Sequence, residues 1–205
     1  MKKILTVLVL ALATLTVSAQ DFKKFRFGPT AGLNVAKISK TGADMRIGFN
    51  VGARVEYNFN NTYYLASGLL FTQKGLKGSS STSTLKANPG YIEIPINFGC
   101  RYVLNDKLSI FTEAGPYLGF GICGKWKIDN ISHNFFGDEG SAILEFATPY
   151  DSPKRFDFGL GFAIGAEYAN FQLRVGYELG LTKVFSGGPD NPQNRNLFVG
   201  LSYMF

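Results

Sequence analysis

The sequence predicts an all-β fold, namely a closed eight-stranded antiparallel transmembrane β-barrel with an up-and-down meander. Apolar and polar residues alternate with a period of two over eight stretches of the chain. The connections between these stretches alternate between short and long, as in outer-membrane barrels. Aromatic residues make up 15% of the 205 residues and there are 24 glycines, whereas charged residues make up only 18%. This composition excludes an intrinsically disordered chain.

Residues 1–19 have the pattern of a cleaved signal peptide, which leaves residues 20–205 as one barrel domain. Two lysines precede an apolar stretch over residues 4–17, and small residues at 17–19 form a cleavage site. The alternative is a membrane anchor, for which the apolar stretch is short. No cysteine follows the cleavage site, so a lipoprotein is excluded. We therefore expect an exported protein.

The strand at 155–168 gives the clearest example of the alternation, with phenylalanine, leucine and isoleucine on one face and glycine, aspartate and glutamate on the other. The eight predicted strands cover residues 25–35, 46–57, 63–73, 91–102, 108–126, 155–168, 171–181 and 196–205. Short turns are predicted at 58–62, 105–107 and 169–170, and longer loops at 36–45, 75–90, 127–154 and 186–194. With an even number of strands, both termini fall on the side of the short turns, which predicts a periplasmic location for both.

The apolar face is predicted to contact lipid and the polar face to fill the lumen. A soluble, lipocalin-like barrel would reverse the two faces. The polar face is rich in glycine, which weakens a water-facing strand but suits a narrow lumen. The chain also ends on an aromatic residue, Phe205. Aromatic residues near strand ends on the apolar face are predicted to form interfacial girdles: Tyr57, Tyr63, Tyr102, Trp126, Tyr168, Phe171 and Tyr203.

Charged residues on the polar face are predicted to form a network inside the barrel, because isolated buried charges are costly. The expected members are Arg54, Glu56, Glu93, Arg101, Glu113, Asp157, Glu167, Arg174 and Glu178, with Arg46, Lys125 and Arg155 nearer the loop end. The network either plugs the barrel or forms a proton or ion pathway. An eight-stranded interior is filled by side chains, which favours the plug.

Catalysis has little support in the sequence. The chain has one histidine, His133, next to Ser132 in the long loop that also holds Asp129, Asp138, Glu139 and Glu145. No positioned base and orienting group can be identified from this pattern, so we expect no enzyme, and no cofactor or metal. Removal of two lysines with the signal peptide leaves 19 basic against 15 acidic residues, too small an excess to indicate a nucleic-acid partner.

The two cysteines, Cys100 and Cys123, are predicted to lie on opposite faces of their strands. A disulfide is chemically possible in an oxidising compartment. The predicted faces separate the two thiols, and we therefore expect both to be free.

Two predicted strands contain short motifs, Tyr91-Ile92-Glu93-Ile94-Pro95 and the segment from Gly28 to Asn34. They resemble the Y-x-E-I-P strand and the opening G-x-x-x-G-L-N strand of the PorT-like outer membrane protein β-barrel domain family of Bacteroides-like Gram-negative bacteria. Phe71-Thr72-Gln73-Lys74-Gly75 resembles the end of its third strand, and Phe156-Asp157-Phe158-Gly159 its F-D-x-G strand. The resemblance covers nearly the whole mature chain. It implies an integral outer-membrane barrel, in a family whose named member serves a secretion system.

Three functions follow as hypotheses. The first is a structural or interaction barrel that displays loops at the cell surface. The second is an accessory subunit of an outer-membrane secretion or uptake complex, and the third, less favoured, is a lipid-modifying enzyme. The expected partners are outer-membrane lipids and lipopolysaccharide, the barrel-assembly machinery and, in the second case, a larger envelope complex. Phe205 is the candidate assembly signal, because outer-membrane barrels commonly end in phenylalanine.

Overall fold

The computed structural model describes residues 24–79, 84–128, 131–138, 141–142, 150–187 and 190–205. The predicted signal peptide lies outside these residues. Among the described residues, no helix is long and apolar enough to cross a membrane.

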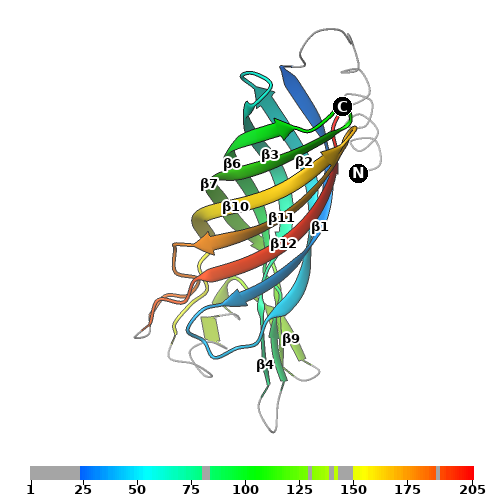
Figure 1. The fold of residues 1–205 in the computed structure, drawn as a ribbon. Coiled ribbons are helices and arrows are strands. Elements are labelled where there is room, and N and C mark those ends of the chain that lie inside the picture. The colour runs from blue at the N-terminus through cyan, green and yellow to red at the C-terminus, as the bar shows by residue number, and fades with distance from the viewer. Residues whose placement is uncertain (1–23, 80–83, 129–130, 139–140, 143–149, 188–189) are drawn as a thin grey trace, which may run out of the picture.

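Eight strands close into one antiparallel barrel, as the alternation predicts (Figure 1). Each strand pairs with its neighbour along the chain, and β1 closes the barrel against β12 in a register that runs from Thr30–Ser202 to Ile38–Asn194. The barrel strands are β1 (Phe25–Ile38), β2 (Arg46–Asn58), β3 (Tyr63–Gln73), β6 (Gly90–Val103), β7 (Leu108–Cys123), β10 (Phe156–Tyr168), β11 (Phe171–Gly180) and β12 (Asn194–Tyr203). We call the end that holds the start of β1 and Phe205 the terminal end, and the opposite end the loop end.

Two of the predicted long loops contain strands of their own. The segment after β3 forms the hairpin β4 (Leu76–Ser79) and β5 (Thr84–Ala87), and the segment after β7 forms β8 (Lys125–Ile128) and β9 (Ile131–Asn134). They join in the order β4-β5-β8-β9 as a separate sheet, which we call the outer sheet, beyond the loop end of the barrel (Figure 1). The predicted strand 108–126 is therefore wrong at its end. It breaks at Gly124, whose φ of 154° favours glycine.

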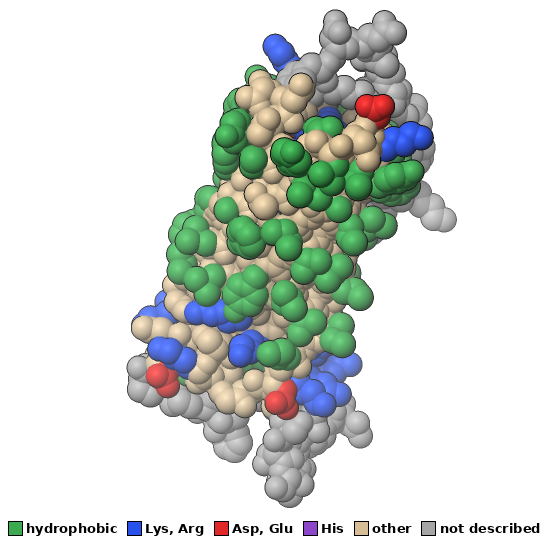
Figure 2. Space-filling model, in the orientation of Figure 1, with side chains coloured by type: hydrophobic (Ala, Val, Ile, Leu, Met, Phe, Trp, Pro, Cys, Tyr) green, Lys and Arg blue, Asp and Glu red, His purple; other side chains and the backbone are tan. Residues whose placement is uncertain are grey.

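The predicted faces of the barrel are confirmed by the burial pattern. Along β11, Leu173 and Val175 are 51% and 41% exposed, whereas Gln172 and Arg174 between them are 0% and 6% exposed. Exposed apolar side chains spread over the barrel wall in Figure 2. An apolar outer wall around a polar, buried interior is the arrangement of a barrel that sits in lipid.

Inward-facing glycines make room for aromatic rings that lie flat against the inner wall. Tyr64 pairs directly with Gly99, and a Cβ at Gly99 would lie 2.2 Å from the Tyr64 ring. Phe111 pairs with Gly165 in the same way, and a Cβ there would lie 2.4 Å from the Phe111 ring. These glycines are needed for close packing, because any side chain would displace the ring of the neighbouring strand.

Apolar side chains of the outer sheet and the remaining loops form one core at the loop end, which we call the capping cluster. Trp126 stacks on Phe135 with a centroid distance of 4.9 Å and lies 6.2 Å from Phe185. The prediction that Trp126 belongs to a lipid-facing girdle is wrong, since the side chain is only 1% exposed. The cluster consists of Ile38, Leu76, Ala87, Tyr91, Trp126, Phe135, Phe136, Tyr150, Val184 and Phe185.

The other predicted girdle aromatics lie at the terminal end. Tyr102 and Tyr168 are 66% and 61% exposed on the barrel wall. The alternation predicts a last strand that runs to Phe205. The strand β12 instead ends at Tyr203, and Phe205 lies just past it. The Phe205 backbone N–H nevertheless donates to the Phe27 carbonyl at 2.8 Å, so the last residue still follows the wall. Cys100 and Cys123 are both free, as expected, but both are exposed, so the prediction that they lie on opposite faces is wrong.

Candidate functional site

The nine charged residues predicted for the lumen all lie inside the barrel. None of them is more than 9% exposed. Two separate groups of ion pairs contain them, one nearer the terminal end and one nearer the loop end. The first, which we call the proximal network, consists of Arg26, Arg54, Glu56, Arg101, Glu113, Glu167 and Arg174. The second, the distal network, consists of Lys74, Glu93, Asp157 and Glu178.

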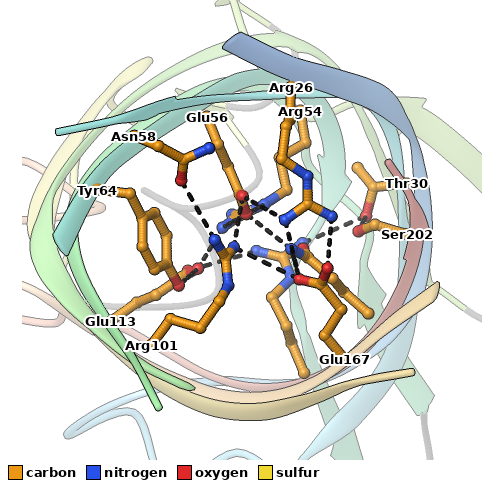
Figure 3. Close-up of polar contacts among 12 residues, drawn as sticks. Arg26, Thr30, Arg54, Glu56, Asn58, Tyr64, Arg101, Glu113, Glu167 and Ser202 are labelled. Atoms are coloured by element: carbon orange, nitrogen blue, oxygen red, sulfur yellow. Dashed lines mark hydrogen bonds and ion pairs between the residues drawn. The ribbon is translucent and has the colours of Figure 1, made fainter. Parts of the chain in front are cut away.

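Glu56 is at the centre of the proximal network (Figure 3). Its carboxylate lies 2.9 Å from Arg54 and 2.7 Å from Arg101, and it accepts a hydrogen bond of 2.8 Å from the Gln172 amide. The side chain has no exposed surface. Charge-assisted hydrogen bonds from two guanidinium groups are the strong kind, and here they come from strands β2 and β6. The carboxylate therefore ties β2 to β6, past the intervening strand β3.

Glu113 and Glu167 extend the proximal network to other strands. Glu113 accepts hydrogen bonds from Arg54 and, at 2.8 Å, from the Tyr64 hydroxyl. Glu167 accepts two hydrogen bonds from Arg26, at 3.0 and 2.6 Å, in a fork geometry. Such bidentate pairs fix the positions of both side chains. Figure 3 shows these side chains pointing from opposite sides of the barrel toward its axis.

Lys74 holds the distal network together. Its Nζ lies 2.6 Å from Glu93, 3.3 Å from Asp157 and 3.3 Å from Glu178. The same nitrogen lies 4.3 Å from the centroid of the Tyr117 ring, which adds a cation–π contact. One ammonium group thus contacts three buried carboxylates.

Two of the five cations in these networks, Arg26 and Lys74, were missed by the sequence analysis. Both continue the inward positions of their strands, Arg26 two residues before Gly28 and Lys74 two residues after Thr72. Arg26 already lies within the predicted strand 25–35, and extension of the period-two pattern by one residue beyond the strand 63–73 would have found Lys74.

The three charges predicted nearer the loop end do not join these networks. Arg155 Nη1 donates to the Gly121 carbonyl at 2.9 Å, and Arg46 is half-buried at the start of β2. Lys125 is exposed, so its inward assignment is wrong. The register shifts between Gly90 and Tyr91 where β6 pairs with β7, and such an irregularity reverses the faces of the residues that follow.

The space left inside the barrel is small. A cavity of about 30 Å³ lies between the two networks, lined among others by Thr72, Glu93, Arg174 and Asn196. This is about the volume of one water molecule. A wider vestibule of about 630 Å³ opens at the terminal end, where its lining includes Arg26, Arg101 and Glu167. The described lumen is therefore open at one mouth and closed in the middle.

The candidate catalytic pair of the sequence analysis is not assembled. Ser132 and His133 are neighbours in β9, where Ser132 pairs with Lys127 and His133 with Trp126. Successive side chains of a strand point to opposite faces, so the hydroxyl and the imidazole diverge. Asp138 is exposed, while Asp129, Glu139 and Glu145 lie outside the described residues. Among the described residues, no group of histidine, cysteine and acidic side chains is arranged to hold a metal ion.

A closed barrel with an apolar outer wall and an ion-paired interior defines an integral β-barrel membrane protein. The model of the family described as "Outer membrane protein beta-barrel domain" matches residues 18–186, and the chain belongs to this family. The protein is thus an integral outer-membrane β-barrel. Comparison with curated proteins finds no match.

Solved structures of small outer-membrane barrels are similar to the fold. Neisserial surface protein A is 15% identical with a TM-score of 0.51, over 91% of this chain and 100% of that chain. The attachment invasion locus protein Ail of Yersinia pestis is 16% identical with a TM-score of 0.43, over 89% of this chain and 99% of that chain. The N-terminal barrel domain of Pseudomonas aeruginosa OprF is 11% identical with a TM-score of 0.39, over 89% and 98%. At these identities the likeness concerns the fold alone.

Proposed function

We propose that this protein is a non-catalytic outer-membrane barrel that presents a rigid recognition platform at the cell surface. The observation that carries the proposal is the outer sheet, which packs on the capping cluster rather than projecting as irregular loops. Binding surfaces on a rigid element lose less entropy when a partner binds. A barrel that served only to fill the membrane would not need an ordered extension.

The closed lumen supports a role other than conduction. The two networks fill the interior with paired charges, and the cavity between them has room for about one water molecule. Reconstituted protein in planar lipid bilayers is expected to give no unitary current steps. Stable steps from the wild-type protein would favour the ion pathway instead.

The proposal places the outer sheet outside the cell and both termini in the periplasm. Outer-membrane barrels have short periplasmic turns and longer extracellular loops. Here the short connections between β2 and β3, between β6 and β7 and between β10 and β11 lie at the terminal end, away from the outer sheet (Figure 1).

Cysteine labelling of intact cells tests this orientation. Cys100 and Cys123 are first replaced by serine, and a single cysteine is then placed at Ser132 of the outer sheet or at Asn60 in a short turn, both of which are exposed. A membrane-impermeant maleimide is expected to label the Ser132→Cys variant in intact cells. The Asn60→Cys variant should react only after lysis. The reverse pattern would contradict the proposed function.

The vestibule favours a second candidate, an accessory subunit of a secretion or uptake complex, as in the PorT-like resemblance. A charged opening of about 630 Å³ at the terminal end could receive a periplasmic segment of a partner. A photocrosslinking residue at Asp106, which lines the vestibule, is compared with one at Ser132. A discrete crosslinked protein at Asp106 alone would support the accessory subunit, and one at Ser132 alone would support the platform.

A further inference from the structure

Three lysines face one another across three neighbouring strands of the outer sheet. Lys77 of β4 pairs directly with Lys86 of β5, and Lys86 pairs directly with Lys127 of β8. All three side chains are exposed. Neighbouring strands lie about 4.8 Å apart, so the three positions span about 10 Å. We call this set the lysine row.

The lysine row has one acid beside it, Asp44, but its lysines are not ion-paired with it. None of its members forms an ion pair with another described residue. The row ends at Ser132, opposite Lys127, and at Asp44, which bridges to Lys77 through the backbone. Like charges directly opposite each other destabilise a sheet. A bound anion would relieve the repulsion, so the arrangement favours an anionic ligand with more than one charged group.

The position of the row indicates which anion it meets. The other side of the same strands carries Leu76, Ala87 and Trp126, which pack into the capping cluster, so the lysines face outward. Lys77 lies opposite Asp44, three residues before Ile47, an exposed apolar residue of the barrel wall. At about 3.3 Å per residue and a strand tilt of about 40°, the row lies roughly 8 Å beyond the lipid-facing band. This is the depth of a lipid's saccharide headgroup rather than of its acyl chains.

A second like-charge pair lies at the same end of the barrel. Lys37 of β1 pairs directly with Arg195 of β12. Both lie on the outward face of their strands, next to the lipid-facing residues of the wall. Arg195 Nη1 is held by the Gly180 carbonyl at 2.7 Å, which fixes its charge at the rim. In Figure 2 basic side chains gather at this end, below the apolar band.

We propose that the lysine row binds the phosphate groups of the saccharide headgroup of the outer-leaflet glycolipid. Lysine ammonium groups bind phosphate as point charges, and a row of three lysines can contact more than one phosphate group. The proposal deepens the proposed function, on whose orientation it rests. It assigns the recognition platform a ligand in the membrane that surrounds it.

Titration of the purified full-length barrel in a neutral detergent tests the proposal. The probes are lipopolysaccharide that carries its phosphates and the same lipopolysaccharide after chemical dephosphorylation. The test variant is Lys86→Gln/Lys127→Gln. The matched control, Lys24→Gln/Lys107→Gln, removes the same charge from exposed positions at the terminal end. The phosphorylated probe is expected to bind the test variant at least tenfold more weakly and the control within twofold of the wild type.

Charge retention separates binding from folding. The variant Lys86→Arg/Lys127→Arg is expected to bind within threefold of the wild type, and all variants should retain the heat-modifiable gel mobility of a folded barrel. Equal losses in test and control, or equal binding of the dephosphorylated probe, would overturn the proposal. Heparin serves as a third probe. A test variant that keeps its affinity for lipopolysaccharide but loses affinity for heparin would also overturn the proposal, because the ligand would then be a soluble sulfated glycan. Because the titration uses purified protein, it is independent of the orientation tested by labelling.

Discussion

Replacement of Lys74 by methionine tests whether ion pairs hold the barrel interior together. Lys74 Nζ lies within 3.3 Å of three carboxylates, and its side chain has no exposed surface. Methionine is similar in length, so the substitution removes the charge without opening a large cavity. Removal of one partner of a buried ion pair costs about 3–5 kcal/mol, because the other charge is left uncompensated. Three carboxylates lose the same partner here, so we expect a loss of about 5 kcal/mol in the free energy of unfolding.

Urea titration of the barrel in lipid vesicles measures this loss. The folded fraction is read from gel mobility without heating, and the free energy of unfolding is extrapolated to water. The control is Lys86→Met in the lysine row, whose side chain is exposed. A surface substitution of this kind should change the free energy of unfolding by no more than about 0.5 kcal/mol.

A double variant identifies the cause of the loss. Lys74→Met/Glu93→Gln removes one of the three carboxylates together with the ammonium group. It should be more stable than Lys74→Met alone, because less uncompensated charge remains buried. If Lys74→Met costs no more than Lys86→Met, the carboxylates are individually solvated and the interpretation of the lumen as a dry, ion-paired plug is refuted.

Three further predictions follow from the same interior and from the end of the chain. Glu93→Ala should cost about 3–5 kcal/mol in urea titration and Asp138→Ala, on the surface, less than about 0.5 kcal/mol; equal effects would mean a wet lumen. Gly99→Ala places a Cβ 2.2 Å from the Tyr64 ring and should cost about 1–3 kcal/mol in the free energy of unfolding. In a protein that already carries Tyr64→Ala, the same substitution should cost much less, because the ring is gone. Fully additive losses would argue against the ring contact. Deletion of Phe205 should slow membrane insertion in pulse-chase assays while the inserted fraction loses only about 1–2 kcal/mol of stability. Normal insertion with a lowered melting point would exclude an assembly signal.

The barrel strands were predictable because each carries its own evidence. In β11 the alternation of side chains predicts residues 171–181, and the strand covers Phe171–Gly180. A strand with one face in lipid and the other in a polar lumen must alternate at every residue. The pattern is therefore local, and no knowledge of the neighbouring strands is needed to read it.

The outer sheet was not predictable in the same way. The alternation from residue 108 continues as far as Trp126, but Gly124 interrupts the strand and the ladder shifts its register at Gly90. One extra residue reverses the two faces. Trp126 therefore turns into the capping cluster instead of toward lipid, and Lys125 turns outward. Whether β5 pairs with β8 depends on two segments that lie far apart in the sequence.

The inward faces of the nine charged residues followed from the sequence, but their partners did not. Glu56 of β2 meets Arg101 of β6 inside the lumen, although β3 lies between the two strands in the barrel. Such contacts depend on the tilt and stagger of the whole barrel. Lys74 shows the further difficulty that a residue just past a strand end can still point inward.

The interior of the barrel and the outer sheet form one continuous packed unit. Tyr91 belongs to the capping cluster, where its ring meets Phe136 with a centroid distance of 6.1 Å, and the same ring lies 5.8 Å from Lys74 Nζ of the distal network. Trp126 occupies the inner side of the strand whose next residue, Lys127, belongs to the lysine row. The spacing of the lysines is thus set by a core that rests on the ion-paired lumen. The charged, closed interior therefore does more than fill the barrel. It supports a surface whose positive charges are held at fixed separations before any ligand binds.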